Sequence, residues 1–216
     1  MKFSNISFVD FLKIRLKREL PGLNSQLKMA MKVNNKLFRK FIPTPDARRS
    51  SVLIVLHGND SLNILLTLRS SKLKHHNNQI SFPGGRNEKN EDSIAAAIRE
   101  TYEETNLVIS TSQIIGNLSE FFVPPSNSLI MPVLAYTSSV DNLVANPDEV
   151  EEIFSVSLHK FIEDEIIKTT NVNVDGYEVE APYWDVHPDV PLWGATSMIL
   201  SELIDLYKEW LEINKY

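Results

Sequence analysis

The sequence predicts an α+β fold, in which a mixed β-sheet is covered by helices. Helical patterns at residues 8–19, 93–105 and 195–213 alternate with groups of short apolar runs bounded by turn residues. Runs of strands separated by single helices are typical of a layered α+β domain. The chain has 216 residues, of which 43% are hydrophobic and 23% charged, so it is long and apolar enough to build a sizeable core.

The N-terminal part differs in pattern from the rest of the chain. Residues 8–19 mix apolar with basic residues, which predicts an amphipathic helix that stops at Pro21. Residues 23–49 are polar and carry two prolines, so we expect an irregular segment there. We therefore predict that residues 1–49 form a helical extension packed on a domain of residues 50–216.

Short apolar runs predict the strands. The runs 51–58 and 63–70 flank the turn-forming pair Asn59-Asp60, which favours two paired strands. Further runs with strand character cover residues 114–123, 129–138, 151–158, 176–186 and 190–194. Residues 93–105 contain no Gly or Pro, and Asp92 stands where an N-cap residue is expected, so this segment predicts a helix. Residues 195–213 carry an apolar stripe at helical spacing.

The composition argues against several classes of function. The net charge is −6 and there is no long basic run, which disfavours binding to nucleic acid or to an anionic membrane. There is no cysteine, so disulfides and cysteine metal sites are excluded. We see neither a signal peptide nor an apolar run of the ~20 residues that span a bilayer, and we expect a cytoplasmic protein acting on a small molecule. The apolar faces of the first and last helices need packing partners, and a homodimer is one way to supply them.

Three glutamates share one face of the central helix. Glu100, Glu103 and Glu104 fall within an arc of roughly 100°, where like charges repel and the last helical turn disfavours negative charge. An ordinary solvated acidic face is the alternative interpretation. Arg99 lies four residues before Glu103 and can pair with it. Clustered carboxylates suit Mg²⁺ or Mn²⁺, which would offset the repulsion and neutralise a diphosphate.

The spacing of these residues resembles the box of the Nudix hydrolases. The matching positions are Gly85, Glu91, Arg99, Glu100, Glu103, Glu104 and Leu107. Thr101 stands where an aliphatic residue is usual, and Asn106 replaces the last glycine of the box. Asparagine tolerates the left-handed conformation that such a helix end needs. The resemblance implies an α/β/α sandwich with a mixed sheet.

The same resemblance implies the roles of the box residues. Glu100 and Glu104 would be the principal ligands of Mg²⁺ or Mn²⁺, with the carbonyl group of Gly85 contributing. Glu103 would bind a further metal ion or help to activate water. Arg99 and Glu91 would orient the carboxylates, so that Glu100, Glu103, Glu104 and Arg99 form the predicted catalytic set.

The segment before the box is similar to the signature of coenzyme A pyrophosphatases within the Nudix family. The similar positions are Leu65 to Ser70, Lys74, Asn78, Ile80, Phe82 and Pro83 to Gly85. Lys74, Asn78 and Ile80 replace the Arg, Gly and Val of that signature. The resemblance implies cleavage of coenzyme A into 3′,5′-ADP and 4′-phosphopantetheine, and it gives the predicted substrate-binding residues Arg69, Lys74, Ser81, Phe82 and Gly84.

Other interpretations remain open at this point. Glu149 is a candidate extra metal ligand or base, and a solvent-exposed loop is the alternative. His75 and His76 suggest a metal site, although adjacent histidines in a basic loop favour a surface position. A pyrophosphatase of another nucleoside diphosphate derivative, such as NADH, ADP-ribose or a nucleotide sugar, is the nearest alternative function. A non-catalytic ligand sensor is the second, but such domains typically lose the carboxylates that this chain keeps.

Overall fold

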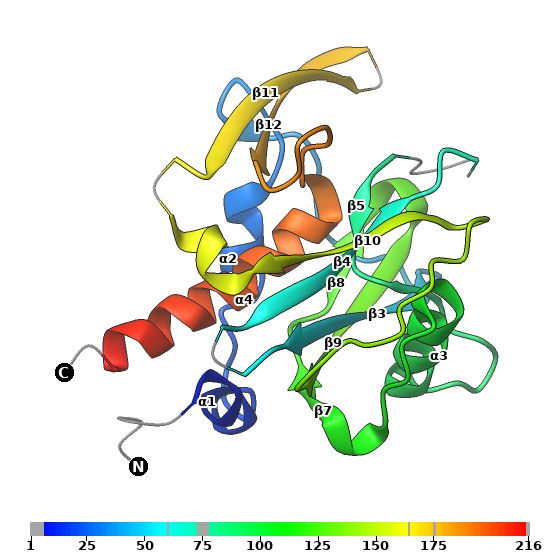
Figure 1. Cartoon of the computed structure of the whole chain (residues 1–216). Helices are drawn as coiled ribbons and strands as arrows, with labels where there is room; N and C mark the ends of the chain where they lie inside the picture. Colours follow the sequence, from blue (N-terminus) through cyan, green and yellow to red (C-terminus); the bar gives the residue numbers. More distant parts are fainter. Residues whose placement is uncertain (1–6, 60, 73–77, 164, 175, 215–216) are drawn as a thin grey trace.

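A computed structural model describes residues 7–59, 61–72, 78–163, 165–174 and 176–214. A mixed β-sheet lies between α3 (Ser93–Thr105) on one face and α1 (Phe8–Arg15) and α4 (Gly194–Ile213) on the other (Figure 1). This arrangement confirms the predicted α+β sandwich. No helix among the described residues is long and apolar enough to cross a membrane.

The central sheet has eight strands, with β3 (Arg48–His57) and β9 (Ser128–Thr137) as its middle pair. These two strands run parallel, and their neighbours run antiparallel. The outer strands of the main path are β4 (Asn63–Arg69), β10 (Val150–Ser157) and β7 (Ile114–Asn117). Three short strands pair alongside: β5 (Ile80–Ser81) with β4, β6 (Gly84–Arg86) with β3, and β8 (Phe121–Val123) with β9. The run predicted as one strand at 114–123 is thus divided into β7 and β8.

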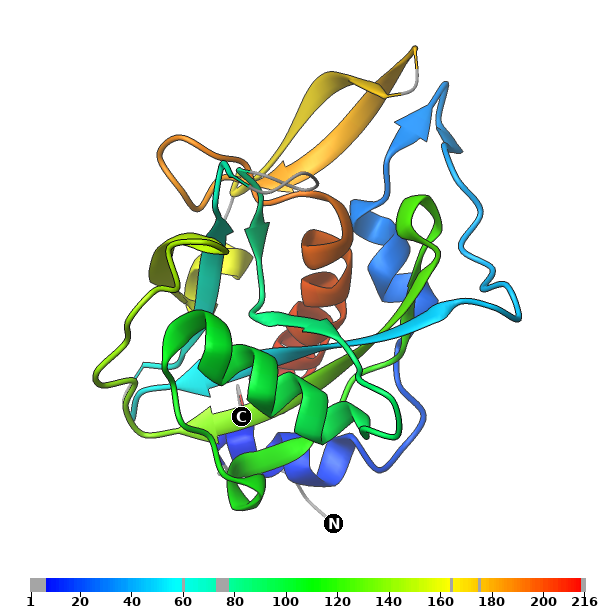
Figure 2. The same cartoon turned by 90° about the vertical axis from the view of Figure 1, so that its right-hand side faces the viewer.

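Strand β3 shows why its sequence is a continuous apolar run. Leu53 and Val55 point into the core beneath α3, whereas Ile54 and Leu56 point into the core beneath α1 and α4. Successive strand residues face opposite sides of a sheet, so a strand covered on both faces must be apolar at every position. The sheet is therefore held between two cores, and α3 is fixed against one of them (Figure 2).

Both ends of α3 follow the sequence prediction. The carboxylate of Asp92 accepts hydrogen bonds from the N–H groups of Ile94 and Ala95, each at 2.9 Å. Asn106 ends the helix in the left-handed conformation, with φ 59°. Thr101 is fully buried, and its hydroxyl donates to the Ala97 carbonyl at 2.7 Å, so it occupies the usual aliphatic position with its polar group satisfied.

The N-terminal segment is more ordered than its sequence predicts. It contains α2 (Leu23–Gln26), the 3₁₀ turn η1 (Leu27–Met29), and the two-residue strands β1 (Lys32–Val33) and β2 (Lys36–Leu37). These strands join β11 (Ile167–Val174) and β12 (Tyr177–Trp184) in a second sheet of order β11-β12-β1-β2. The first helix ends at Arg15, with Leu16 as its C-cap, earlier than predicted. The boundary at residue 49 stays a prediction, although β3 begins at Arg48.

Three of the connections contain short 3₁₀ turns: η2 (Thr111–Gln113), η3 (Pro124–Ser126) and η4 (Leu158–Ile162). The predicted β-like character of residues 190–194 is reduced to one bridge between Trp184 and Leu192.

The fully buried carboxylate of Glu202 on α4 connects distant segments. It accepts hydrogen bonds from the N–H of Gly22 at 2.9 Å, from Gln26 at 3.1 Å and from Ser119 at 2.7 Å.

Candidate active site

The three predicted glutamates of α3 differ sharply in exposure. The side chain of Glu103 is 53% exposed, that of Glu100 is 17% exposed, and that of Glu104 is 2% exposed. Burial raises the pKa of Glu104 to about 8, against the opposing effects of Arg69 and the Gly84 N–H group. Burial also raises the pKa of Glu100. Both carboxylates are therefore harder to ionise than an exposed glutamate. A cation bound beside them would favour the ionised form.

Arg99 holds the exposed side of this cluster together. Its guanidinium donates to Glu91 at 2.9 Å, to Glu100 at 2.9 Å and to Glu103 at 3.1 Å. It also donates to the backbone carbonyl of Arg86 at 3.2 Å. The pair between Arg99 and Glu103 that the helical spacing predicts is present. Because its planar fork serves several acceptors at once, Arg99 fixes the carboxylates relative to one another.

Two glycines let the chain pass close to α3. A Cβ on Gly84 would lie 2.4 Å from the Ser51 carbonyl oxygen, and Gly84 has a φ of +150°. A Cβ on Gly85 would lie 2.3 Å from a carboxylate oxygen of Glu100, so any other residue there would displace that carboxylate. The Gly84 N–H donates to Glu104 at 3.2 Å. The turn therefore brings backbone groups onto the predicted metal ligands.

Arg69 approaches the same helix from the end of β4. Its Nη1 lies 3.6 Å from Glu104 Oε1, and its buried Nε has no hydrogen-bond partner among the described residues. The next residue, Ser70, donates its N–H to the carbonyl of Glu149 at 2.9 Å. The charge of Glu149 raises the pKa of both Glu100 and Glu104. The structure thus brings Arg69 and Glu149, from two other elements, to the glutamates of α3.

Two of the predicted substrate-binding residues, Phe82 and Ser81, have side chains that are already packed or hydrogen-bonded within the protein. Phe82 is 2% exposed within the core between the sheet and α4, so its side chain packs and does not reach the site. Ser81 lies at the site's edge, where its hydroxyl forms a hydrogen bond of 3.1 Å with Thr67. Lys74, like the adjacent His75 and His76, lies outside the described residues. Asn78 has a φ of 52°, as its replacement of a glycine predicts.

The comparisons with known proteins bear on this site directly. Residues 47–174 match the family model of the NUDIX domain, which is more than half of the chain. The chain belongs to the Nudix family. It is 29% identical over 169 residues to Nudix hydrolase 3 of Caenorhabditis elegans, a match covering 71% of this chain and 70% of that protein.

Two further Nudix relatives extend well beyond the matched part. Nudix hydrolase 15, mitochondrial, of Arabidopsis thaliana is 33% identical over 161 residues, covering 71% of this chain and 56% of that protein. Peroxisomal coenzyme A diphosphatase ndx-8 of C. elegans is 32% identical over 155 residues, covering 69% and 64%. Among solved structures, a MutT/nudix family protein from Enterococcus faecalis has a TM-score of 0.55 at 22% identity, covering 96% of this chain and 70% of that chain. This likeness confirms the Nudix fold.

Nudix hydrolases act on phosphorus anhydrides and generally need divalent ions such as Mg²⁺ or Mn²⁺. Within the described part of this chain, no three acidic or histidine side chains form a group able to hold an ion by themselves. Mg²⁺ does not require such a group, because it is usually bound through one or two carboxylates, with water and substrate phosphates completing its shell. Buried Glu104, half-buried Glu100 and the adjacent backbone of Gly85 fit that pattern.

The structure also reveals a hollow that the sequence reasoning missed. Its volume is about 460 Å³, and it is lined by Arg86, Asn87, Glu88, Lys89, Arg99 and Glu100. Four of these residues lie in the five-residue spacer between Gly85 and Glu91. The sequence signal was the pair of cations in that spacer, but a Nudix box leaves the spacer unspecified, so nothing pointed to them. In the structure they lie beside a predicted metal ligand.

Proposed function

We propose that this Nudix hydrolase cleaves the diphosphate bond of coenzyme A or its derivatives. The products of free coenzyme A are 3′,5′-ADP and 4′-phosphopantetheine. An acylated coenzyme would give 3′,5′-ADP and the acyl-phosphopantetheine.

The observation that carries this proposal is the contact between Arg69 and Glu104. Arg69 belongs to the coenzyme A signature and Glu104 to the Nudix box, and their charged groups lie 3.6 Å apart. The side chain of Arg69 is 25% exposed, and its guanidinium carries five N–H donors, so it has capacity to donate to a substrate phosphate as well as to contact Glu104. The similarity to the C. elegans coenzyme A diphosphatase supports the same substrate class.

The box residues then take the following roles. Glu100 and Glu104, with the carbonyl of Gly85, hold Mg²⁺ or Mn²⁺, and Glu149 adds a carboxylate from the β9–β10 loop. The bound ion supplies charge neutralisation on the diphosphate oxygens and lowers the pKa of water. Arg99, tied to Glu91, sets the positions of Glu100 and Glu103.

Glu103 is assigned to the attacking water. It is the most exposed of the three α3 glutamates, and its orientation is fixed by Arg99 at 3.1 Å. The water oxygen forms a bond to one phosphorus, the bond from that phosphorus to the bridging oxygen breaks, and Glu103 takes the water's proton. The leaving phosphate carries away the bridging oxygen and its electron pair. Positioning and charge stabilisation suffice for such a transfer, since phosphoryl groups react through loose transition states.

Product analysis tests the proposal. The purified chain is incubated with Mg²⁺ or Mn²⁺ and with coenzyme A, NADH, ADP-ribose or nucleoside triphosphates, beside a Glu103→Gln variant. We expect 3′,5′-ADP from coenzyme A at a higher kcat/KM than for the other compounds, and a fall in kcat of about 10²-fold or more in the variant. If another diphosphate is cleaved and coenzyme A is not, the coenzyme A assignment is wrong while the Nudix chemistry stands.

A chain that binds metal but cleaves none of these compounds would instead be a ligand sensor. The retained carboxylates argue for the enzyme.

The predicted cytoplasmic location stays a prediction, because the names of the relatives include one mitochondrial and one peroxisomal protein. The predicted homodimer also stays a prediction.

A further inference from the structure

The geometry points to an anion subsite formed by Arg86 and Lys89, which binds a phosphate of the substrate other than the diphosphate. It rests on the proposed function, because it is defined relative to a diphosphate bound over Glu100 and Glu104. For coenzyme A the extra group is the 3′-phosphate on the ribose.

The subsite lies at one end of the carboxylate pair. Glu100 and Glu104 are four residues apart on α3, which separates them by about 6 Å along the helix axis. Arg69 stands at the Glu104 end. The hollow that contains Arg86 and Lys89 has Glu100 in its wall and so stands at the other end. A diphosphate over the two glutamates is therefore flanked by Arg69 on one side and by the hollow on the other.

The charges in the hollow suit an anion. Its lining includes three basic side chains, from Arg86, Lys89 and Arg99, and two acidic ones, from Glu88 and Glu100. Arg99 is engaged by three carboxylates, and Glu100 is engaged by Arg99 and by the proposed metal ion. Arg86 and Lys89 are exposed, and neither forms an ion pair with a described residue. Among the basic side chains of the hollow, Arg86 and Lys89 are therefore the two available to bind an anion.

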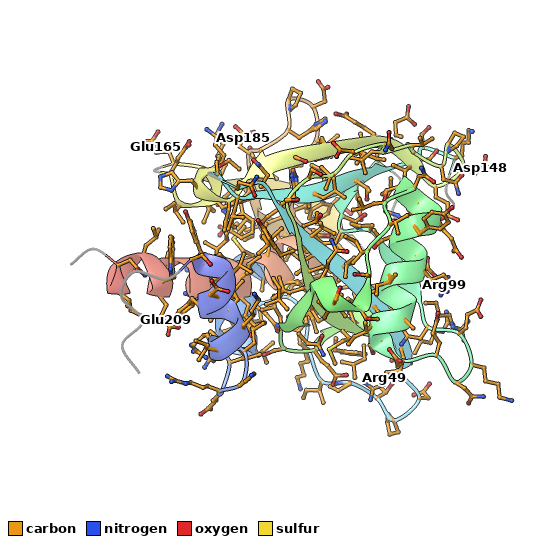
Figure 3. All side chains as sticks on the ribbon, turned by 60° about the horizontal axis from the view of Figure 1, so that its bottom comes forward. Arg49, Arg99, Asp148, Glu165, Asp185 and Glu209 are labelled. Carbon is orange, nitrogen blue, oxygen red and sulfur yellow. The ribbon has the colours of Figure 1, made fainter. Side chains whose placement is uncertain are left out.

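The backbone that carries these cations is held in place. The N–H of Asn87 donates to the Arg49 carbonyl at 3.1 Å, and its side chain accepts from the Ser51 hydroxyl at 2.8 Å. The N–H of Glu88 donates to the Glu91 carboxylate at 2.9 Å. Figure 3 shows Arg49 and Arg99 on the side of the molecule where α3 lies. Since the loop is anchored at both ends, less ordering is needed when an anion binds.

The polar groups of the lining also favour one end of the substrate over the other. All six lining residues are charged or polar, so the hollow offers little apolar surface to a pantetheine arm. A phosphate carries strong acceptor oxygens that match a guanidinium and an ammonium group. The hollow therefore selects for the nucleotide end of coenzyme A and for its 3′-phosphate.

Coenzyme A and 3′-dephospho-coenzyme A carry the same diphosphate and differ in the 3′-phosphate. Comparing them therefore isolates the contribution of the proposed subsite. We expect wild type to show a KM about tenfold lower for coenzyme A than for the dephospho compound. In an Arg86→Gln/Lys89→Gln double variant this ratio should fall close to one through a higher KM for coenzyme A. Lys208→Gln, an exposed cation on α4, serves as the matched control and should keep the wild-type ratio.

Binding of product nucleotides without turnover gives the second readout. By calorimetry, 3′,5′-ADP should bind wild type about tenfold more tightly than 5′-AMP, and the double variant should bind both alike. Equal losses for both coenzymes, or an unchanged ratio in the double variant, would overturn the subsite. If wild type cleaves neither coenzyme, the proposed function fails, and the subsite is supported or overturned by the nucleotide binding alone.

Discussion

At the scale of single residues, two arginines from different elements contact the glutamates of α3. Arg99 lies on the helix itself and contacts Glu91, Glu100 and Glu103. Arg69 comes from β4, and its Nη1 lies 3.6 Å from Glu104 Oε1. Helical spacing predicts the pair of Arg99 with Glu103, whereas the role of Arg99 and Glu91 in orienting the carboxylates was implied by the family resemblance. The second contact joins two distant elements, and it was not predicted, because the family resemblance gave Arg69 only as a substrate-binding residue.

Arg69 provides the sharpest test at this scale. We expect Arg69→Ala to lower kcat/KM for coenzyme A by about 30-fold, because a charge-assisted hydrogen bond to phosphate is worth roughly 2 kcal/mol. Arg49→Ala removes an exposed arginine that pairs with Glu120 and is the control, expected to stay within about twofold. Unchanged KM and kcat in Arg69→Ala would refute a substrate role for Arg69.

The pair between Glu91 and Arg99 predicts a dependence of stability on pH. The Arg99 guanidinium lowers the pKa of Glu91 from 4.5 to about 2. Between those values the unfolded chain binds more protons than the folded one, so stability present above pH 4.5 is lost as the pH falls through 2. We expect Glu91→Gln to be less stable than wild type at pH 7 and to lose less stability on acidification.

Urea unfolding at a series of pH values measures this effect. Glu151→Gln, an exposed carboxylate, is the control and should follow the wild-type curve. Parallel curves for wild type and Glu91→Gln would contradict the assignment of this stabilisation to the Glu91–Arg99 pair.

At the scale of elements, α3 was predictable from sequence at both ends and on both faces. Asp92, Thr101 and Asn106 each act through hydrogen bonds or backbone angles within a few residues of their own position. The strands β1 and β2 were not predicted, because each has two residues and exists only through pairing that reaches β12, more than 140 residues later. The sequence pattern of a short segment does not indicate which distant segment it will pair with.

The end of α3 allows a stability test with a matched pair of substitutions. Asn106 has a φ of 59°, and its side chain donates to the Asn142 carbonyl at 3.2 Å. We expect Asn106→Ala to lower the free energy of unfolding by about 1–2 kcal/mol, since alanine is strained in the left-handed region. Asn106→Gly, the residue usual in the Nudix box, should cost less than about 0.5 kcal/mol. Equal losses in thermal or urea unfolding would contradict a conformational role.

At the scale of the whole molecule, the carboxylate of Glu202 connects the N-terminal segment, the turn after β7 and the last helix. From sequence, a glutamate in an amphipathic helix indicates a solvent-facing position. In the structure it is fully buried, because Ser119, Gly22 and Gln26 supply donors that no local pattern reveals. Its burial also explains how residues before position 49 are held against the rest of the chain.

Replacing that carboxylate should destabilise the entire fold. Glu202→Gln puts an amide NH₂ group opposite N–H and O–H donors, so buried groups are left unsatisfied. We expect a loss of about 2–4 kcal/mol in the free energy of unfolding, measured with urea. Glu212→Gln, exposed on the same helix, should change it by less than about 0.5 kcal/mol. Similar values for the two variants would show that Glu202 does not connect the segments energetically.

The central claim is that the carboxylates of α3 form a metal centre, and Mn²⁺ binding tests it most directly. Electron paramagnetic resonance of free Mn²⁺ gives the affinity of wild type, of Glu100→Gln, and of the exposed control Glu19→Gln. We predict that wild type and Glu19→Gln bind Mn²⁺ alike, while Glu100→Gln binds at least tenfold more weakly, because an amide is a poorer ligand than a carboxylate for a hard cation. The same affinity in all three proteins would contradict a metal centre at this helix.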